Sequence, residues 1–191
     1  MASVFTPLET PRTRLVLPDV EDAPRLIRYY KENQRHLARW ESVRADEFYT
    51  EAFWLSEISK IRDEFVSDES VRLIILDRSD PAGAILGQCS LRNIIRGAFQ
   101  ACYLGYSLRH EAEGKGLMFE AVTAVIAYAF DDMGLHRIMA NYMPTNERSA
   151  RLLRRLGFSV EGYARDYLFL AGKWQDHIMT ALINPSVVEA Q

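Results

Sequence analysis

The residues that point most clearly to chemistry lie in segment 104–130, LGYSLRHEAEGKGLMFEAVTAVIAYAF. This segment predicts a strand, a short glycine-containing turn and an amphipathic helix in succession, so that free backbone N–H groups converge at the helix N-terminus. Gly114 and Gly116 remove side chains where a phosphate must approach the backbone, and Lys115 adds a positive charge. We therefore expect an anion site suited to a pyrophosphate.

Two common nucleotide-binding motifs do not describe this turn. Its Gly-Lys pair lacks the earlier glycine and the following Ser or Thr of a P-loop. It also differs from a dinucleotide-binding turn, because no parallel βαβ unit is predicted around it. Glycines before a helix can also serve only as a tight connection, so the turn alone leaves both interpretations open.

The elements that must position the turn follow from the pattern of apolar residues. Residues 14–20 alternate as a short strand, and Asp22 is the expected cap of the next helix. Apolar residues recur at near-helical spacing over 26–40 and 53–65, which predicts two helices. Three β-branched or aromatic-rich runs separated by turn residues predict an antiparallel meander over 71–77, 84–94 and 101–108.

The second half of the chain alternates between helices and strands. A helix is expected from about 117 to 133, where Gly134 ends it, and a strand over 136–143 follows. Asn146 can cap a further helix that Gly157 closes. A final pair of strands is expected over 159–170 and 174–183. This order predicts a single α/β domain with a mixed, mostly antiparallel sheet flanked by helices, a pattern that permits many activities.

Length and composition fit one ordinary globular domain. The 191 residues carry a formal net charge of −3, which gives no global attraction to nucleic acid or to an anionic membrane. No segment resembles a signal peptide or a membrane span, so we expect a cytoplasmic protein. Cys89 and Cys102 lie in apolar runs and are expected as buried free thiols. We divide the chain into a polar leader (1–12), a catalytic domain (13–184) and a tail (185–191).

Three motifs together resemble the GNAT acetyltransferase superfamily and, more narrowly, ribosomal-protein alanine N-acetyltransferases of the RimJ type. They are LGYSLRHEAEGKGLM (104–118), HRIMANYMPTNERS (136–149) and LLRRLGF (152–158). The later segment 161–177, EGYARDYLFLAGKWQDH, also fits, and the resemblance runs from about residue 13 to residue 181. It implies a GNAT fold and acetyl-coenzyme A as the acetyl donor, with no metal.

The resemblance also implies where the coenzyme binds. The pyrophosphate would contact the backbone of Glu113, Gly114, Lys115, Gly116, Leu117, Met118 and Phe119. Tyr106, Ser107 and Leu108 would pair with the pantetheine arm like an added strand, and Asn146 would contact that arm. Two positions depart from the superfamily consensus, since Glu113 replaces Gln or Arg and Met118 replaces Gly or Ala. Because backbone amides do the binding, both changes should be tolerated, provided that Glu113 points away from the pyrophosphate.

The expected reaction is direct attack of an amine on the thioester in a ternary complex. An α-amino group, with a pKa of about 8, is easier to deprotonate than Lys at about 10.4. A strand amide near Ser107 or Leu108 would hold the oxyanion. Related N-terminal acetyltransferases use a glutamate and a tyrosine, but Asn141 and Leu153 align there. By resemblance to the sister RimL-type enzyme, Ser149 is the expected acid.

The general base is assigned only to a group of candidates, namely Glu41, Asp166 and Tyr167. The four histidines share no metal-ligand spacing, so no metal site is expected. An arginine-rich helical face could meet the coenzyme's 3′-phosphate or ribosomal RNA, or could simply be solvated; it comprises Arg148, Arg151, Arg154 and Arg155.

The acceptor favoured by the resemblance is the N-terminal α-amino group of an alanine in a small-subunit ribosomal protein, which could be modified free or on the assembling subunit. Two alternatives stay open. One is a small amine such as a polyamine or an aminoglycoside, which would require carboxylates in the acceptor pocket. The other is a non-catalytic acyl-coenzyme A sensor or ribosome assembly factor that retains the binding turn.

Overall fold

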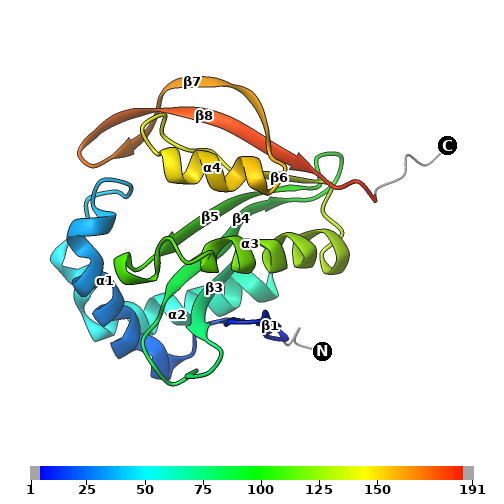
Figure 1. Ribbon diagram of the computed structural model, residues 1–191. Coiled ribbons are helices and arrows are strands. Elements are labelled where there is room, and N and C mark those ends of the chain that lie inside the picture. The colour runs from blue at the N-terminus through cyan, green and yellow to red at the C-terminus, as the bar shows by residue number, and fades with distance from the viewer. Residues whose placement is uncertain (1–4, 187–191) are drawn as a thin grey trace.

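Eight strands form one sheet that runs through the molecule (Figure 1). The computed structural model describes residues 5–186. Its strands follow the spatial order β1-β2-β3-β4-β5-β6-β8-β7, and only β5 and β6 are parallel neighbours among them. The strands are β1 Leu8–Glu9, β2 Thr13–Val16, β3 Val71–Asp77, β4 Gly87–Ile95, β5 Ala101–Leu108, β6 Arg137–Met139, β7 Ser159–Leu170 and β8 Lys173–Ile183. The predicted mixed, mostly antiparallel sheet is confirmed.

Helices cover both faces of the sheet (Figure 1). On one face lie α1 (Ala23–Leu37) and α2 (Glu51–Val66), and on the other lie α3 (Leu117–Ala127) and α4 (Glu147–Arg155). Strand β3 contributes side chains to the hydrophobic cores on both faces of the sheet, because successive side chains of a strand point to opposite faces. Its Leu73 and Ile75 pack in the core beneath α3, whereas Ile74 and Leu76 pack beneath α1 and α2. No helix in residues 5–186 is long and apolar enough to cross a membrane.

The central meander agrees closely with the sequence. β3 and β5 have the predicted bounds, and β4 begins three residues later than residue 84. Cys89 and Cys102 are buried in this core, and burial raises the pKa of both thiols to about 12. Their expected character as buried free thiols is confirmed.

The first strand and the first helix differ in detail from the prediction. β2 ends at Val16, because residues 20–22 form a short 3₁₀ helix, η1 (Val20–Asp22). Asp19 caps η1, accepting a hydrogen bond from the Val20 N–H. Asp22 occupies the N-cap position of α1, as predicted, but its side chain makes no capping hydrogen bond to that helix. Its carboxylate instead accepts from the Asp19 N–H at 2.9 Å and pairs with Arg25.

Two elements after the turn are shorter than predicted. α3 ends at Ala127 and continues as a π-helix, η4 (Tyr128–Asp132), so the expected helical span is filled by two helix types. β6 covers only three residues of the predicted 136–143. Beyond Met139 the backbone leaves β5 and bonds to β8 alone, with the Ala140 N–H donating to the Thr180 carbonyl at 3.0 Å. Two further 3₁₀ turns, η2 (Asp46–Tyr49) and η3 (His110–Ala112), join the larger elements.

The segment assigned to a polar leader packs onto the domain from residue 5 onward, while residues 1–4 lie outside the described range. The Phe5 ring makes edge contacts with Phe65 and Tyr128, with centroids 5.6 and 5.5 Å away. Strand β1 then pairs with β2. The part of the tail at 187–191 also lies outside the described residues.

Glu120 of α3 ties this N-terminal segment to the helix that follows the turn. Its carboxylate accepts hydrogen bonds from Thr10 Oγ1 at 2.5 Å, from the Arg12 N–H at 2.6 Å and from Arg12 Nε at 2.9 Å. Burial alone would raise the pKa of Glu120, but these hydrogen bonds outweigh burial and lower it. The ionised carboxylate therefore stabilises the folded chain.

Replacing Glu120 with Gln should lower the free energy of unfolding by about 1–2 kcal/mol, because hydrogen bonds to a charged group are lost. A lowered folded-state pKa gives stability that is present above the unfolded pKa and lost as pH falls through the folded one. Chemical denaturation of both proteins at pH 7 and pH 4 measures this. The difference between wild type and Glu120→Gln should shrink at the lower pH, and a constant difference would contradict the ionic contribution.

Candidate functional site

The predicted site residues converge where two parallel strands separate. β5 and β6 pair only from Ala101↔Arg137 to Tyr103↔Met139. Beyond this point β6 turns toward β8, and β5 continues to Leu108 paired, among the described strands, with β4 alone. Residues 104–108 therefore present a free backbone edge, the kind of edge to which an extended amide-bearing chain can add as a strand.

The turn after β5 has the backbone form that an anion site needs. Gly114 and Gly116 have φ angles of 73° and 79°, a left-handed region that favours glycine. Gly116 is the N-cap of α3, and no side chain within residues 5–186 caps it. The first N–H groups of α3 are thus left for solvent or a ligand. Pyrophosphate binding at this turn stays a prediction that the geometry allows.

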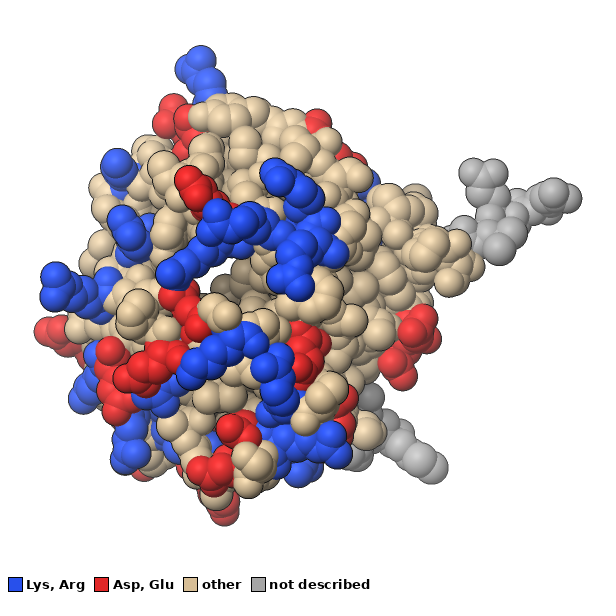
Figure 2. Space-filling model, in the orientation of Figure 1, with Lys and Arg blue, Asp and Glu red and all other residues tan. Residues whose placement is uncertain are grey.

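A groove of about 480 Å³ lies between this turn and α4. Figure 2 shows the hollow, with Lys and Arg side chains along its border. Of the eleven predicted coenzyme contacts, Lys115 is absent from the groove lining; it faces a neighbouring cavity with Arg12, whose Nη1 donates to the Lys115 carbonyl. The other ten all line the groove. Positive charge is supplied instead from α4, by Arg148, Arg151 and Arg155.

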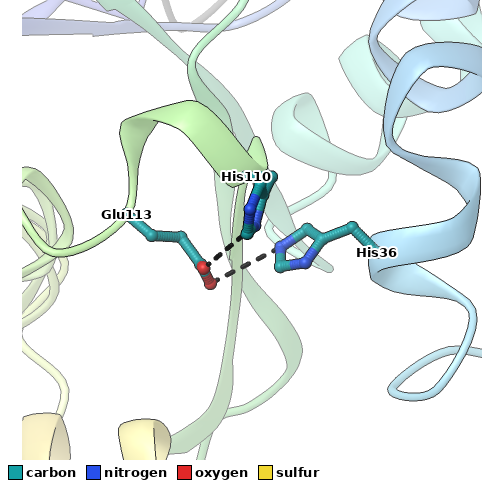
Figure 3. Close-up of side chains that lie close together, drawn as sticks. All are labelled: His36, His110 and Glu113. Carbon is teal, nitrogen blue, oxygen red and sulfur yellow. Dashed lines mark ion pairs between the residues drawn. The ribbon is translucent and has the colours of Figure 1, made fainter.

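Glu113, the acidic departure in the turn, is held by cationic and imidazole side chains. Its carboxylate forms an ion pair with Arg148 across the groove. It also faces His36 Nε2 at 3.5 Å and His110 Nδ1 at 3.6 Å (Figure 3). Residue spacing carries no signal for this grouping, because His36 and Arg148 lie far from Glu113 in the chain and only His110 is close to it. The carboxylate is thus partly neutralised beside the expected pyrophosphate position.

Ser149 is a buried residue of the groove lining, at the start of α4. The Asn146 side chain caps this helix, as predicted, and accepts a hydrogen bond from the Ser149 N–H at 3.1 Å. Ser149 Oγ lies 2.6 Å from the Tyr106 hydroxyl oxygen. Burial raises the pKa of Tyr106, so its hydroxyl stays protonated and can donate to Ser149. The two residues form a hydroxyl pair that sequence spacing alone does not reveal.

A second cavity of about 960 Å³ lies against the first, between the α1–α2 connection and the β7–β8 hairpin. Its walls include four aromatic side chains, namely Trp40, Trp54, Tyr103 and Tyr167. Four residues line both cavities, and they are Trp40, Glu41, Tyr106 and Ser107. The two cavities therefore meet at the free edge of β5, where a bound thioester and an acceptor could come into contact.

The candidate bases occupy different places. Glu41 lines both cavities, and its carboxylate pairs with Arg44 at 2.5 Å. Tyr167 lines the second cavity, with its hydroxyl 3.4 Å from Asn141 Nδ2. Asp166 is exposed at a register shift of β7, has a φ of 47°, and is not among the lining residues of either cavity. The geometry thus favours Glu41 and Tyr167 over Asp166.

Replacing Gly116 with Ala should weaken coenzyme A binding at least about tenfold, which is 1.4 kcal/mol. The added methyl group strains a left-handed residue by about 1–2 kcal/mol and occupies the surface that a pyrophosphate would approach. Isothermal titration with coenzyme A measures the affinity.

Gly97→Ala is the matched control, because Gly97 has a φ of 72° in the β4–β5 turn and its added Cβ would meet nothing within 4 Å. Both variants should lose similar stability, and only Gly116→Ala should lose affinity. Equal coenzyme affinities in the two variants would contradict the assignment of the turn.

Comparison with known proteins agrees with this geometry. Residues 12–159 match the model of a family described as an acetyltransferase (GNAT) domain. The chain is 44% identical over 178 residues to the [Ribosomal protein uS5]-alanine N-acetyltransferase of Escherichia coli strain K12. The aligned residues cover 93% of this chain and 91% of the relative.

Two solved structures share the whole fold. The ribosomal-protein-S5-alanine acetyltransferase of Vibrio fischeri superposes with a TM-score of 0.90 at 36% identity, covering 95% of this chain and 98% of that one. Mycobacterium smegmatis RimJ in complex with CoA-disulfide gives a TM-score of 0.86 at 26% identity, over 97% and 89% of the chains. With the family model matching most of its length, the chain belongs to the GNAT acetyltransferase family and is an N-acetyltransferase.

Proposed function

We propose that this protein transfers the acetyl group of acetyl-coenzyme A to the N-terminal α-amino group of an alanine in a small-subunit ribosomal protein, in the cytoplasm. The 44% identity to an enzyme named for this reaction on uS5 supports the acceptor. The meeting of two cavities at Tyr106 and Ser107 carries the proposal, because it brings a donor groove and an acceptor cleft to one strand edge.

The proposed reaction uses this edge directly. With the pantetheine arm along residues 106–108, the amine nitrogen attacks the thioester carbonyl carbon and a strand amide near Ser107 or Leu108 holds the oxyanion. Collapse of the resulting tetrahedral intermediate forms the amide bond and breaks the C–S bond of the thioester. The departing sulfur takes a proton from the Ser149 hydroxyl. Tyr106 can then return a proton to Ser149 through the hydrogen bond between the two hydroxyl groups. The proton of the amine passes, directly or through water, to the Glu41 carboxylate, and the Tyr167 hydroxyl can relay it.

The charges of the acceptor cavity favour a peptide over a polyamine. A polyamine site needs free carboxylates, and this cavity contains Glu41, Glu47 and Glu57. However, Glu41 pairs with Arg44 at 2.5 Å and Glu57 pairs with Arg72 at 2.6 Å, while Arg92 also lines the wall. The cavity therefore offers little net attraction to a polycation, whereas its aromatic walls suit the side chains of a peptide.

In this proposal the arginine face of α4 binds the acetyl donor, coenzyme A, rather than an RNA. Arg148, Arg151 and Arg155 line the coenzyme groove, where they could meet the phosphates of coenzyme A. Arg154 is not part of that lining, and ribosomal RNA contact by this face, like action on the assembling subunit, stays a prediction.

Thiol release from acetyl-coenzyme A should require a free N-terminal amine. The assay compares a short peptide that begins with Ala, the same peptide with its N-terminus blocked, and spermidine. Release with the free peptide alone is expected. Release with spermidine alone would move the acceptor to small amines, and coenzyme binding without release for any acceptor would favour a sensor.

Ser149→Ala should lower kcat by about 10- to 100-fold, toward the lower range for a general acid because a thiolate is a fair leaving group. Tyr106→Phe should give a smaller fall in kcat and leave the KM for acetyl-coenzyme A nearly unchanged, since it removes only the donor to Ser149. Steady-state kinetics with the Ala-starting peptide measure both. An increase in KM without a fall in kcat would assign Ser149 to binding instead of proton transfer.

A further inference from the structure

Two of the four histidines of the chain meet beside the coenzyme groove, although 74 positions separate them. His36 lies in the last turn of α1, and His110 begins η3. Their ring centroids are 5.1 Å apart with an interplanar angle of 56°. Figure 3 shows both imidazoles directed at the Glu113 carboxylate. Three residues from two separate segments thus point toward one small volume.

The spacing of these groups differs from that of a hydrogen-bonded cluster. His36 Nε2 lies 3.5 Å from Glu113 Oε1, and His110 Nδ1 lies 3.6 Å from Glu113 Oε2. Hydrogen bonds between such atoms are usually about 2.7–3.2 Å long. Two ligand atoms that each lie about 2.0–2.1 Å from a tetrahedral zinc ion are about 3.3 Å apart. The two measured separations are therefore closer to a metal-bridged arrangement, and the ligand atoms all lie within 4.8 Å of one another.

We propose that His36, His110 and Glu113 form a binding site for a divalent transition-metal ion of the zinc class. Two imidazole nitrogens and a carboxylate are ligands that Zn²⁺ and Co²⁺ accept, with a fourth position left for water or another oxygen ligand. The His110 side chain is 72% exposed, so an ion can reach the site from solvent.

Other groups near the site compete weakly for the ion or for its ligands. The Arg148 side chain that pairs with Glu113 is 66% exposed, and exposed ion pairs contribute little free energy. An ion held by two imidazoles can displace this guanidinium. Cys89 and Cys102 are buried, and their raised thiol pKa keeps them protonated. The thiols therefore do not offer an alternative zinc site.

An ion here would act on the coenzyme groove, a consequence that rests on the proposed function. Glu113 lines the groove beside Gly114, where its negative charge opposes a pyrophosphate. A bound cation neutralises that charge and releases Arg148 toward the groove. Metal and coenzyme should then bind more tightly together than apart, and by linkage the effect is reciprocal.

The first test titrates Co²⁺ and Zn²⁺ into the full-length protein carrying no histidine tag. A Co²⁺ absorption spectrum typical of four- or five-coordinate nitrogen and oxygen ligation is expected, and Zn²⁺ should abolish it. His36→Ala, His110→Ala and Glu113→Gln should each weaken Zn²⁺ binding at least about tenfold. Glu111→Gln is the matched control, because Glu111 lies in the same turn, is 77% exposed and pairs with Arg109.

Absence of the Co²⁺ spectrum, or equal Zn²⁺ affinity in all four variants, would overturn the metal site. His110→Ala keeps this test decisive even if His36→Ala destabilises α1, since His110 is largely exposed. Metal binding is measured without acetyl transfer. A negative result would therefore overturn the metal site and leave the proposed acetyltransferase function untouched.

The second test measures coenzyme A affinity by titration with and without saturating Zn²⁺. We expect at least a threefold tighter Kd with Zn²⁺ in the wild type and in Glu111→Gln, and no change in Glu113→Gln. Unchanged affinity in the wild type, with Zn²⁺ shown to be bound, would overturn the electrostatic role of the ion.

Discussion

The separation of β5 from β6 after the pair Tyr103↔Met139 is the constraint on which the site depends. Two parallel strands that stayed paired would satisfy each other's backbone groups and leave no edge. After β6 the chain stays bonded to β8. The Ala140 N–H donates to the Thr180 carbonyl, Tyr142 forms a β-bridge with Ile178, and the Thr180 N–H donates to the Asn141 side chain at 3.3 Å. The opened edge is then bordered by α4. The sheet geometry therefore creates the donor groove before any side chain acts on a ligand.

Charge around this edge is arranged in local pairs. Glu113 is balanced by Arg148 at the mouth of the donor groove, and Glu41 is balanced by Arg44 where the two cavities meet. Arg44 also lies over the rings of Tyr30 and Phe48, at 4.3 and 3.9 Å from their centroids, which fixes the guanidinium. Each carboxylate is consequently held in place near a reacting region without leaving a large net charge there.

Local patterns predicted those parts of the structure that local physics determines. The meander from Val71 to Leu108 was found because β-branched or aromatic-rich runs separated by turn residues are typical of strands and their connections. The length of β6 was overestimated because the chain loses β5 as a partner after Met139 and keeps hydrogen bonds only to β8, about 40 residues later in the chain. Lys115 was expected beside the phosphates, yet tertiary contact with Arg12 places it against another cavity. Similarly, no spacing rule could reveal that His36 and His110 share one carboxylate.

The two departures in the binding turn show why a site built from backbone tolerates sequence change. Met118, which stands where the superfamily has a small residue, is 8% exposed and packs into the core beneath α3, so its side chain adds to the hydrophobic layer while its N–H remains part of the helix start. At Glu113, partners on α1 and α4 hold the carboxylate. What the ligand requires at this turn is the left-handed backbone at Gly114 and Gly116, which side chains at neighbouring positions do not determine. Differences in substrate among proteins with this fold should therefore arise chiefly from the acceptor cavity, whose lining includes none of the turn residues 113–119.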